Sequence, residues 1–184
     1  MRSRSAAIVA LALALSGTSA AAQQVPQDEL AYIRAHMDQL VQLNPLRLDD
    51  AAVRAVFAAP IYLVRIIIND PNGNPTTSLM VARSGDSLVA ISQPSEEGDC
   101  PDIHKLLKPG FKLTSAAAAA TLQSALDAVF PVSGPDAEAR AIRHTGNEWT
   151  FVRGKFFDNG MGFVMRTDAT GRITGVRWSL KLPA

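Results

Sequence analysis

One cysteine and one histidine lie four residues apart in the segment Asp99-Cys100-Pro101-Asp102-Ile103-His104. A thiol beside a helix start has a lowered pKa, and a histidine four residues further on can act as its base. Four neighbouring acidic residues oppose thiolate formation. Cys100 and His104 are therefore weak candidates for thiol chemistry, and the alternative is a free, half-buried cysteine before a Pro-Asp helix start.

Other arrangements that could do chemistry are missing or have simpler explanations. The histidines, His36, His104 and His144, form no closely spaced metal-binding pair, and one cysteine cannot build a thiolate zinc site. Helix capping explains the acidic pair at 49–50, and a solvated loop explains the pair at 96–97. The nucleophile-elbow, phosphate-loop and dinucleotide motifs do not occur. We expect no metal and no cofactor.

Charge is divided unevenly along the chain. Residues 23–137 carry eight basic and thirteen acidic side chains, whereas residues 138–184 carry eight basic and four acidic ones. In the second stretch arginines alternate with aromatic residues, which is typical of protein-recognition surfaces. The candidate binding residues are Trp149, as the aromatic anchor, with Arg153, Arg177 and Lys181. The alternative is a solvated sheet face whose basic residues protect its edges.

The first 22 residues have the pattern of a secretory signal peptide. Arg2 and Arg4 precede an apolar run at 6–15, and small residues follow up to Ala22. Ten residues rise only about 15 Å as a helix, half of a hydrocarbon core of about 30 Å. We therefore expect cleavage after Ala22, a periplasmic or secreted product, and no transmembrane segment in the mature chain.

Composition excludes several classes of protein. Of the 184 residues, 47% are hydrophobic and 19% charged, with 18 basic and 17 acidic side chains. These values exclude a disordered tail, a polycation and a disulfide-knotted miniprotein, and with the export signal they argue against a nucleic-acid partner. Removing 22 residues from 184 leaves a mature chain of 162 residues. A chain of this length buries, on folding, about 70% of the surface that its unfolded form exposes. Because Cys100 has no second cysteine to bond, stability must come from packing.

Hydrophobic periodicity and turn chemistry predict the elements. The expected helices span 28–43, 49–58 with Asp49 as its N-cap, and 114–130; the expected strands span 61–68, 76–83, 87–93, 138–144, 148–157, 161–167 and 172–182. The polar, Pro/Gly-rich stretch 94–113 predicts a linker with one short helix. In the last strand the alternation places Trp178 in the core and Arg177 on the wet face.

These elements predict an α+β fold in which helices pack on antiparallel β-meanders. The expected parts are a helical pair with a three-stranded meander at 23–93, the linker at 94–113, and a helix with a four-stranded antiparallel meander at 114–184. The halves form either two tandem helix-pair-plus-sheet units or one domain. In element order this plan is similar to that of the secreted β-lactamase-inhibitory proteins, although the chain lacks their paired cysteines.

The function predicted from these features is binding without catalysis. We expect an exported, inhibitor-like module that recognises another exported protein, with acidic character, through the C-terminal sheet. Two alternatives remain: a thiol-dependent enzyme that uses Cys100 and His104, and a carrier that holds a small apolar ligand between helices and sheet.

Overall fold

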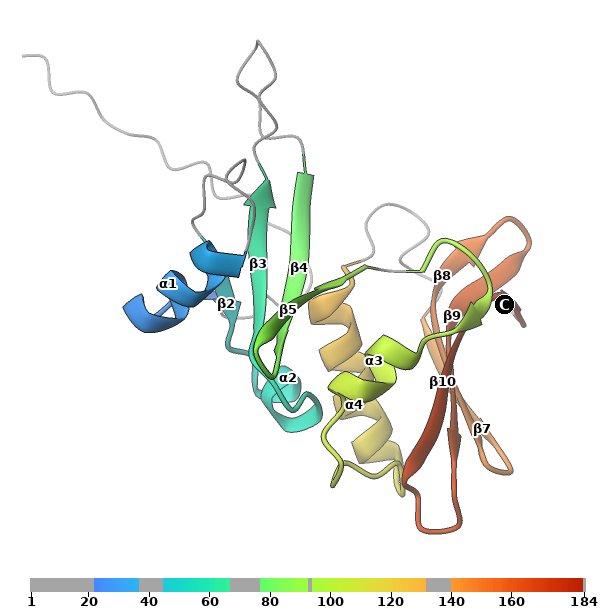
Figure 1. Cartoon of the computed structure of the whole chain (residues 1–184). Coiled ribbons are helices and arrows are strands. Elements are labelled where there is room, and N and C mark those ends of the chain that lie inside the picture. The colour runs from blue at the N-terminus through green and yellow to red at the C-terminus, as the bar shows by residue number, and fades with distance from the viewer. Residues whose placement is uncertain (1–21, 37–44, 67–76, 93, 132–139, 184) are drawn as a thin grey trace, which may run out of the picture.

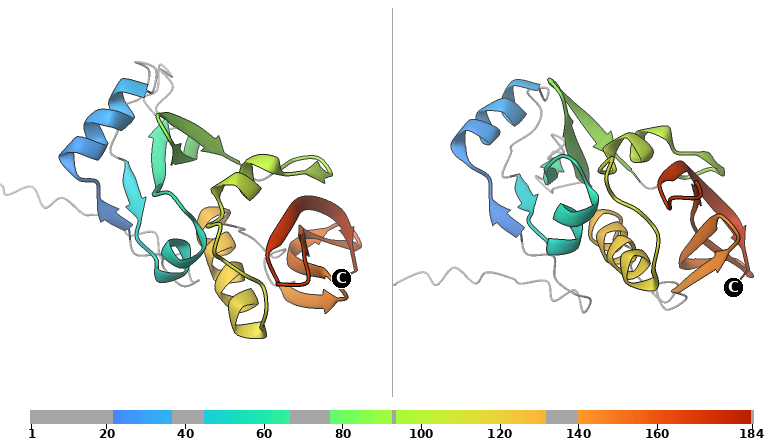
Figure 2. Two further views of the ribbon diagram at one scale, coloured as in Figure 1. Left: turned by 60° about the horizontal axis from the view of Figure 1, so that its bottom comes forward. Right: turned by 90° about the horizontal axis from the view of Figure 1, so that it is seen from below.

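The structure is a computed structural model that describes residues 22–36, 45–66, 77–92, 94–131 and 140–183. These residues form helices and two antiparallel sheets, each with five strands. The α+β fold with antiparallel meanders is therefore confirmed. Figures 1 and 2 show helix α4 between the two sheets. The expected signal peptide lies outside the described residues except for Ala22, which begins the first strand.

The first sheet has the strand order β1-β2-β3-β4-β5. Its strands are β1 (Ala22–Gln24), β2 (Leu46–Leu48), β3 (Ile61–Ile66), β4 (Thr77–Ser84) and β5 (Ser87–Ile91). The meander β3-β4-β5 was predicted, whereas β1 and β2 were not. Helix α1 (Gln27–His36) covers one face, where Ile33 packs with Tyr62 and Val64. Ile61 belongs to the larger core on the other face, so both faces of β3 are buried, which explains its nearly continuous apolar run.

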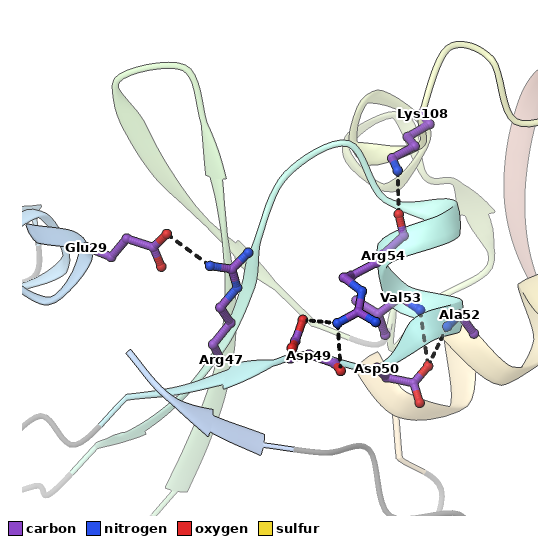
Figure 3. Close-up of polar contacts among 8 residues, drawn as sticks. All are labelled: Glu29, Arg47, Asp49, Asp50, Ala52, Val53, Arg54 and Lys108. Carbon is purple, nitrogen blue, oxygen red and sulfur yellow. Dashed lines mark hydrogen bonds and ion pairs between the residues drawn. The ribbon is translucent and has the colours of Figure 1, made fainter. Parts of the chain in front are cut away.

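Helix α2 (Ala51–Val56) begins at Asp50, whose carboxylate accepts the backbone N–H groups of Ala52 and Val53. Asp49 was the expected cap, and that assignment is wrong. Its carboxylate instead forms an ion pair with Arg54 (Figure 3). A capping oxygen must reach the second or third helical N–H, and only the residue directly before the helix is placed to do so.

The second sheet has the order β6-β10-β9-β8-β7. Its strands are β6 (Gly98–Asp99), β7 (Ala141–Thr145), β8 (Glu148–Phe156), β9 (Asn159–Thr167) and β10 (Ile173–Leu182). Helix α4 (Ala116–Val129) is capped by Ser115, whose hydroxyl accepts the N–H of Ala118. The inward face of α4 joins Phe163 and Trp178 in one core cluster. Because the predicted four-stranded meander has β6 added along β10, the second sheet also has five strands.

Residues 94–113 are packed against both sheets. They supply β6 and the expected short helix, α3 (Pro101–Leu106). Ile103, Leu106 and Leu107 are buried in the cluster that also holds core residues of both sheets. The Lys108 ammonium donates to the carbonyl oxygen of Arg54 and so ties this segment to α2 (Figure 3). The apolar residues of this segment make it part of the core, although its polar composition resembles that of a solvated linker.

Candidate functional site

Arg153 does not lie on the binding surface where we expected it. Its side chain is 0% exposed, and its guanidinium donates to Asp127 Oδ1 of α4, from Nε at 3.2 Å and from Nη2 at 3.0 Å. It also donates to the carbonyl oxygen of Phe130. Burial lowers the pKa of Arg153, and the carboxylate of Asp127 counters that effect. Arg153 lies where the pairing of β8 with β9 shifts register, between Val152 and Gly154, and its contacts with Asp127 and Phe130 show that it points inward.

Trp149, expected on the surface as the aromatic anchor, is also buried. The side chain is 7% exposed and belongs to the main core cluster. Its indole stacks on the ring of His144, with centroids 4.0 Å apart and planes 12° apart. Trp149 and Phe151 occupy alternate positions of β8, and both belong to the main core cluster. Trp149 therefore supports the edge of the core and presents little surface to a partner.

Arg177 and Lys181 remain exposed on β10, as expected, but their surroundings differ. The Lys181 ammonium lies 3.3 Å from Oε2 of Glu97, whose Oε1 accepts the backbone N–H of Leu180 at 2.9 Å. That N–H group is the main reason that the pKa of Glu97 is lowered. For Arg177 no ion pair or side-chain hydrogen bond occurs within the described part of the chain. Arg177 is therefore the better candidate for contact with a partner.

Arg177 is the fourth of five residues in a row that crosses the outer face of the second sheet from β7 to β6. The register pairs Arg143 with Thr150, Thr150 with Val164, Val164 with Arg177, and Arg177 with Asp99. Paired residues in antiparallel strands place their side chains on the same face. From β7 to β6 the row thus consists of a basic, a polar, an apolar, a basic and an acidic side chain.

A surface depression of about 430 Å³ contains Arg177 at the junction of β9, β10 and α3. Arg166 lines the same depression, and its Nε donates to Glu148 at 2.9 Å. His104 of α3 lines it as well, with Nε2 3.1 Å from the carbonyl oxygen of Ile173. Since a carbonyl oxygen can only accept, Nε2 is the donor of this hydrogen bond. The depression combines cationic groups with acceptors and apolar side chains.

The candidate thiol pair is not assembled in this geometry. Cys100 is buried, its Sγ donates to the carbonyl oxygen of Gly98 at 3.6 Å, and burial raises the pKa of the thiol. The His104 ring bonds Ile173 on β10. Cys100 lines a different depression, on the β5 side of α3. A nucleophilic cysteine needs a lowered pKa and a base in contact with it, and the structure shows neither feature for Cys100.

The space where a carrier would hold its ligand is filled by side chains. Ala119, Leu122 and Leu126 of α4 are all 0% exposed, and so are Phe163 and Trp178 of the sheet that they face. Three depressions surround α3, and no residue of α4 lines any of them. Of the alanine run at 116–120 only Ala119 is buried, so the close packing comes from Ala119 and Ala125 together with the large side chains of α4.

The sequence argument named only Arg177 among the residues of this depression as a binding candidate. Asp99 and Pro101 reach it because β6 pairs with β10, and a two-residue strand has no periodic signal. His104 was considered only as a base for Cys100. An amphipathic reading of α3, with Ile103 and Leu106 inward, would have placed His104 toward the edge of the buried face.

Comparison with known proteins found no matching family model, no matching curated protein and no matching solved structure. The described residues contain no helix that is long and apolar enough to cross a membrane. Within the same residues no three histidine, cysteine or acidic side chains gather in a way that could hold a metal ion.

Proposed function

We propose that this protein is an exported, non-catalytic binding module that recognises an acidic segment of another protein at the Arg177 depression. The exposed guanidinium of Arg177 carries the proposal, because the structure describes no local carboxylate paired with it. A guanidinium binds a carboxylate through two parallel hydrogen bonds. Asp99, on the neighbouring strand, offers an acceptor for a peptide N–H group. Val164 and Val176 also line the depression but are each only 4% exposed, so the polar groups would supply most of the contact with a partner.

Export is supported by the order of basic, apolar and small residues in the first 22 positions. We expect mass analysis of the protein recovered from its own cells to show a new N-terminus at Gln23. Gln23 and Gln24 would still pair with Arg47 and Leu46 of β2, so cleavage after Ala22 is compatible with the first sheet. An intact Met1 in the recovered protein would contradict export by this route.

The binding proposal predicts a loss of affinity when the charge of Arg177 is reversed. The tagged full chain is recovered from its own cells, co-purifying proteins are identified, and the affinity of the recovered partner is measured. Arg177→Glu with Lys181→Glu should weaken binding at least about tenfold, and Arg177→Glu alone should account for most of the loss because Lys181 already faces Glu97. Binding should also weaken as salt is raised, since exposed charges are screened over about 8 Å at physiological ionic strength.

Two control variants separate this proposal from its alternatives. Arg172→Glu makes the same charge change in a different depression and should leave the affinity unchanged. Cys100→Ser should also leave it unchanged, whereas a thiol-dependent enzyme would lose its activity. Unaltered circular dichroism and melting temperature show that each variant is folded. If every protein that co-purifies with the unchanged chain also co-purifies with the Arg177→Glu variant, this depression is not the binding site.

A further inference from the structure

The turn between β8 and β9 exposes two adjacent aromatic rings. Phe157 is 85% exposed and Phe156 is 42% exposed, and their centroids lie 4.7 Å apart at 74°. The two-residue turn consists of Phe157 and Asp158, between the paired residues Phe156 and Asn159. Lys155 lies next to the rings and is exposed. A large apolar side chain at the tip of a short hairpin is poorly explained by solubility alone.

The backbone at this tip holds Phe157 in an uncommon conformation. Its φ is 53°, and it is the one residue other than glycine with a positive φ among those described. The left-handed region is unfavourable for an L-residue with a bulky side chain, and asparagine or glycine is the usual choice at such a turn. The tight turn fixes the direction in which the Cα–Cβ bond of Phe157 projects. A ring that projects from a fixed backbone is suited to insertion into a pocket, because little backbone freedom is lost on binding.

The same chain contains a pocket that complements this tip. A groove of about 340 Å³ runs between β5 and α3, with Val89, Ile91, Ile103 and Leu106 as its apolar lining. A cavity of about 150 Å³ accepts one benzene, so the groove has room for two phenyl rings. Glu96, lining the groove, is exposed and opposite in charge to Lys155. The groove therefore offers sufficient volume and apolar side chains for the two rings, and acidic residues at its edge for Lys155.

We propose that the Phe156–Phe157 tip of one molecule binds in the β5–α3 groove of a second copy of this chain. The opposite charges of residues 23–137 and 138–184 favour this head-to-tail contact. The proposal does not depend on the function proposed above: neither phenylalanine lines the Arg177 depression, although Asp99 and Pro101 border both that depression and the groove.

Sedimentation velocity of the protein, purified in the form in which its own cells produce it, tests this self-association. We expect the average sedimentation coefficient to rise between about 10 μM and 1 mM, the range of a weak interface, and to rise less at high salt. Phe157→Gly should weaken self-association at least about tenfold. The same change should raise the melting temperature by about 2–4 °C, because glycine adopts a positive φ without strain. Loss of association in this variant thus cannot be attributed to unfolding.

A mixing experiment identifies the two surfaces. Ala90→Lys with Glu96→Lys changes two exposed groove residues and should also weaken self-association. Each variant keeps one intact surface, so an equal mixture should regain association as 1:1 pairs. Ile142→Thr, at an exposed apolar position of β7, should behave as the unchanged protein.

Three results would overturn the proposal. The first is a monomer up to about 1 mM, the weak end of measurable affinity. The second is a Phe157→Gly variant that associates as before, and the third is a mixture that does not regain association. Vesicles of phosphatidylcholine with phosphatidylserine provide a separate assay: if the unchanged protein is monomeric and its vesicle binding is lost in Phe157→Gly, the tip binds a lipid surface instead.

Discussion

Trp178→Ala is expected to lower the free energy of unfolding by about 3–5 kcal/mol, the usual range for removing a buried aromatic side chain. The indole is 0% exposed and meets the ring of Phe163 edge to face, with centroids 4.8 Å apart. Phe163 in turn contacts Phe130 at the end of α4, at 5.4 Å. Removing the indole therefore leaves a cavity where the sheet and helix meet. Denaturation in urea, followed by circular dichroism, measures the loss.

Two variants show whether this loss comes from packing. Arg177→Ala changes the neighbouring residue on the outer face and should alter stability by about 0.5 kcal/mol or less. Trp178→Phe keeps a ring at the contact and removes the indole N–H, which is buried without a hydrogen-bond partner in the described structure. It should therefore cost much less than the alanine variant. Equal effects of Trp178→Ala and Arg177→Ala would mean that the strand faces are assigned wrongly.

Asp127→Ala is expected to cost about 3–5 kcal/mol, because it leaves the buried guanidinium of Arg153 without its counter-charge. Asp127 also forms an ion pair with Arg140 at 3.1 Å and accepts from Gln123 at 3.0 Å. After the substitution Arg153 would retain the carbonyl of Phe130 as its acceptor among the described residues. A buried charge with one neutral partner is costly, and urea denaturation should show the loss directly.

Replacing the other partner of this ion pair, Arg153, should lower the free energy of unfolding less than Asp127→Ala does. Arg153→Met removes the buried charge and keeps most of the side-chain volume, while Asp127 retains Arg140 and Gln123 and is 17% exposed on its side chain. We expect this variant to cost about 1–2 kcal/mol, the scale of a lost charged hydrogen bond. Arg140→Met, at a side chain that is 44% exposed, should cost about 1 kcal/mol or less. A larger loss for Arg153→Met than for Asp127→Ala would contradict this account.

The alternation of side chains along a strand was a better guide than residue class. It placed Trp178 in the core and Arg177 on the outer face, and the structure confirms both positions. Applied to β8, the same rule predicts an inward Arg153, which is the side where the structure places it, although the pairing with β9 shifts register at this residue. The charge argument assigned Arg153 to the surface because its partner, Asp127, lies on a helix 26 residues earlier in the chain. Such a partner is visible only when helix and sheet have been packed together.

Other features could not be predicted because they depend on distant partners. The strands β2 and β6 contain three and two residues, too few for any periodicity, and each is defined by its neighbour in the sheet. The Arg177 depression needs β6 and α3 against β10, so its outline was invisible in the sequence. Phe157 lies at a turn position where phenylalanine is rare, and no propensity argument would assign it a positive φ.

The contact of Glu97 with β10 has a consequence for the order of folding. The hydroxyl group of Ser179 donates a hydrogen bond to Oε1 of Glu97, with the two oxygens 3.1 Å apart. These two residues are 82 positions apart in the chain. Contacts between residues so far apart in sequence close a long loop and form late, which slows folding. The second sheet therefore cannot be completed until β10 has left the ribosome or, in an exported chain, the translocation channel. Until then the β6 segment has no strand to pair with, and a chaperone that binds unpaired strands would have its best opportunity there.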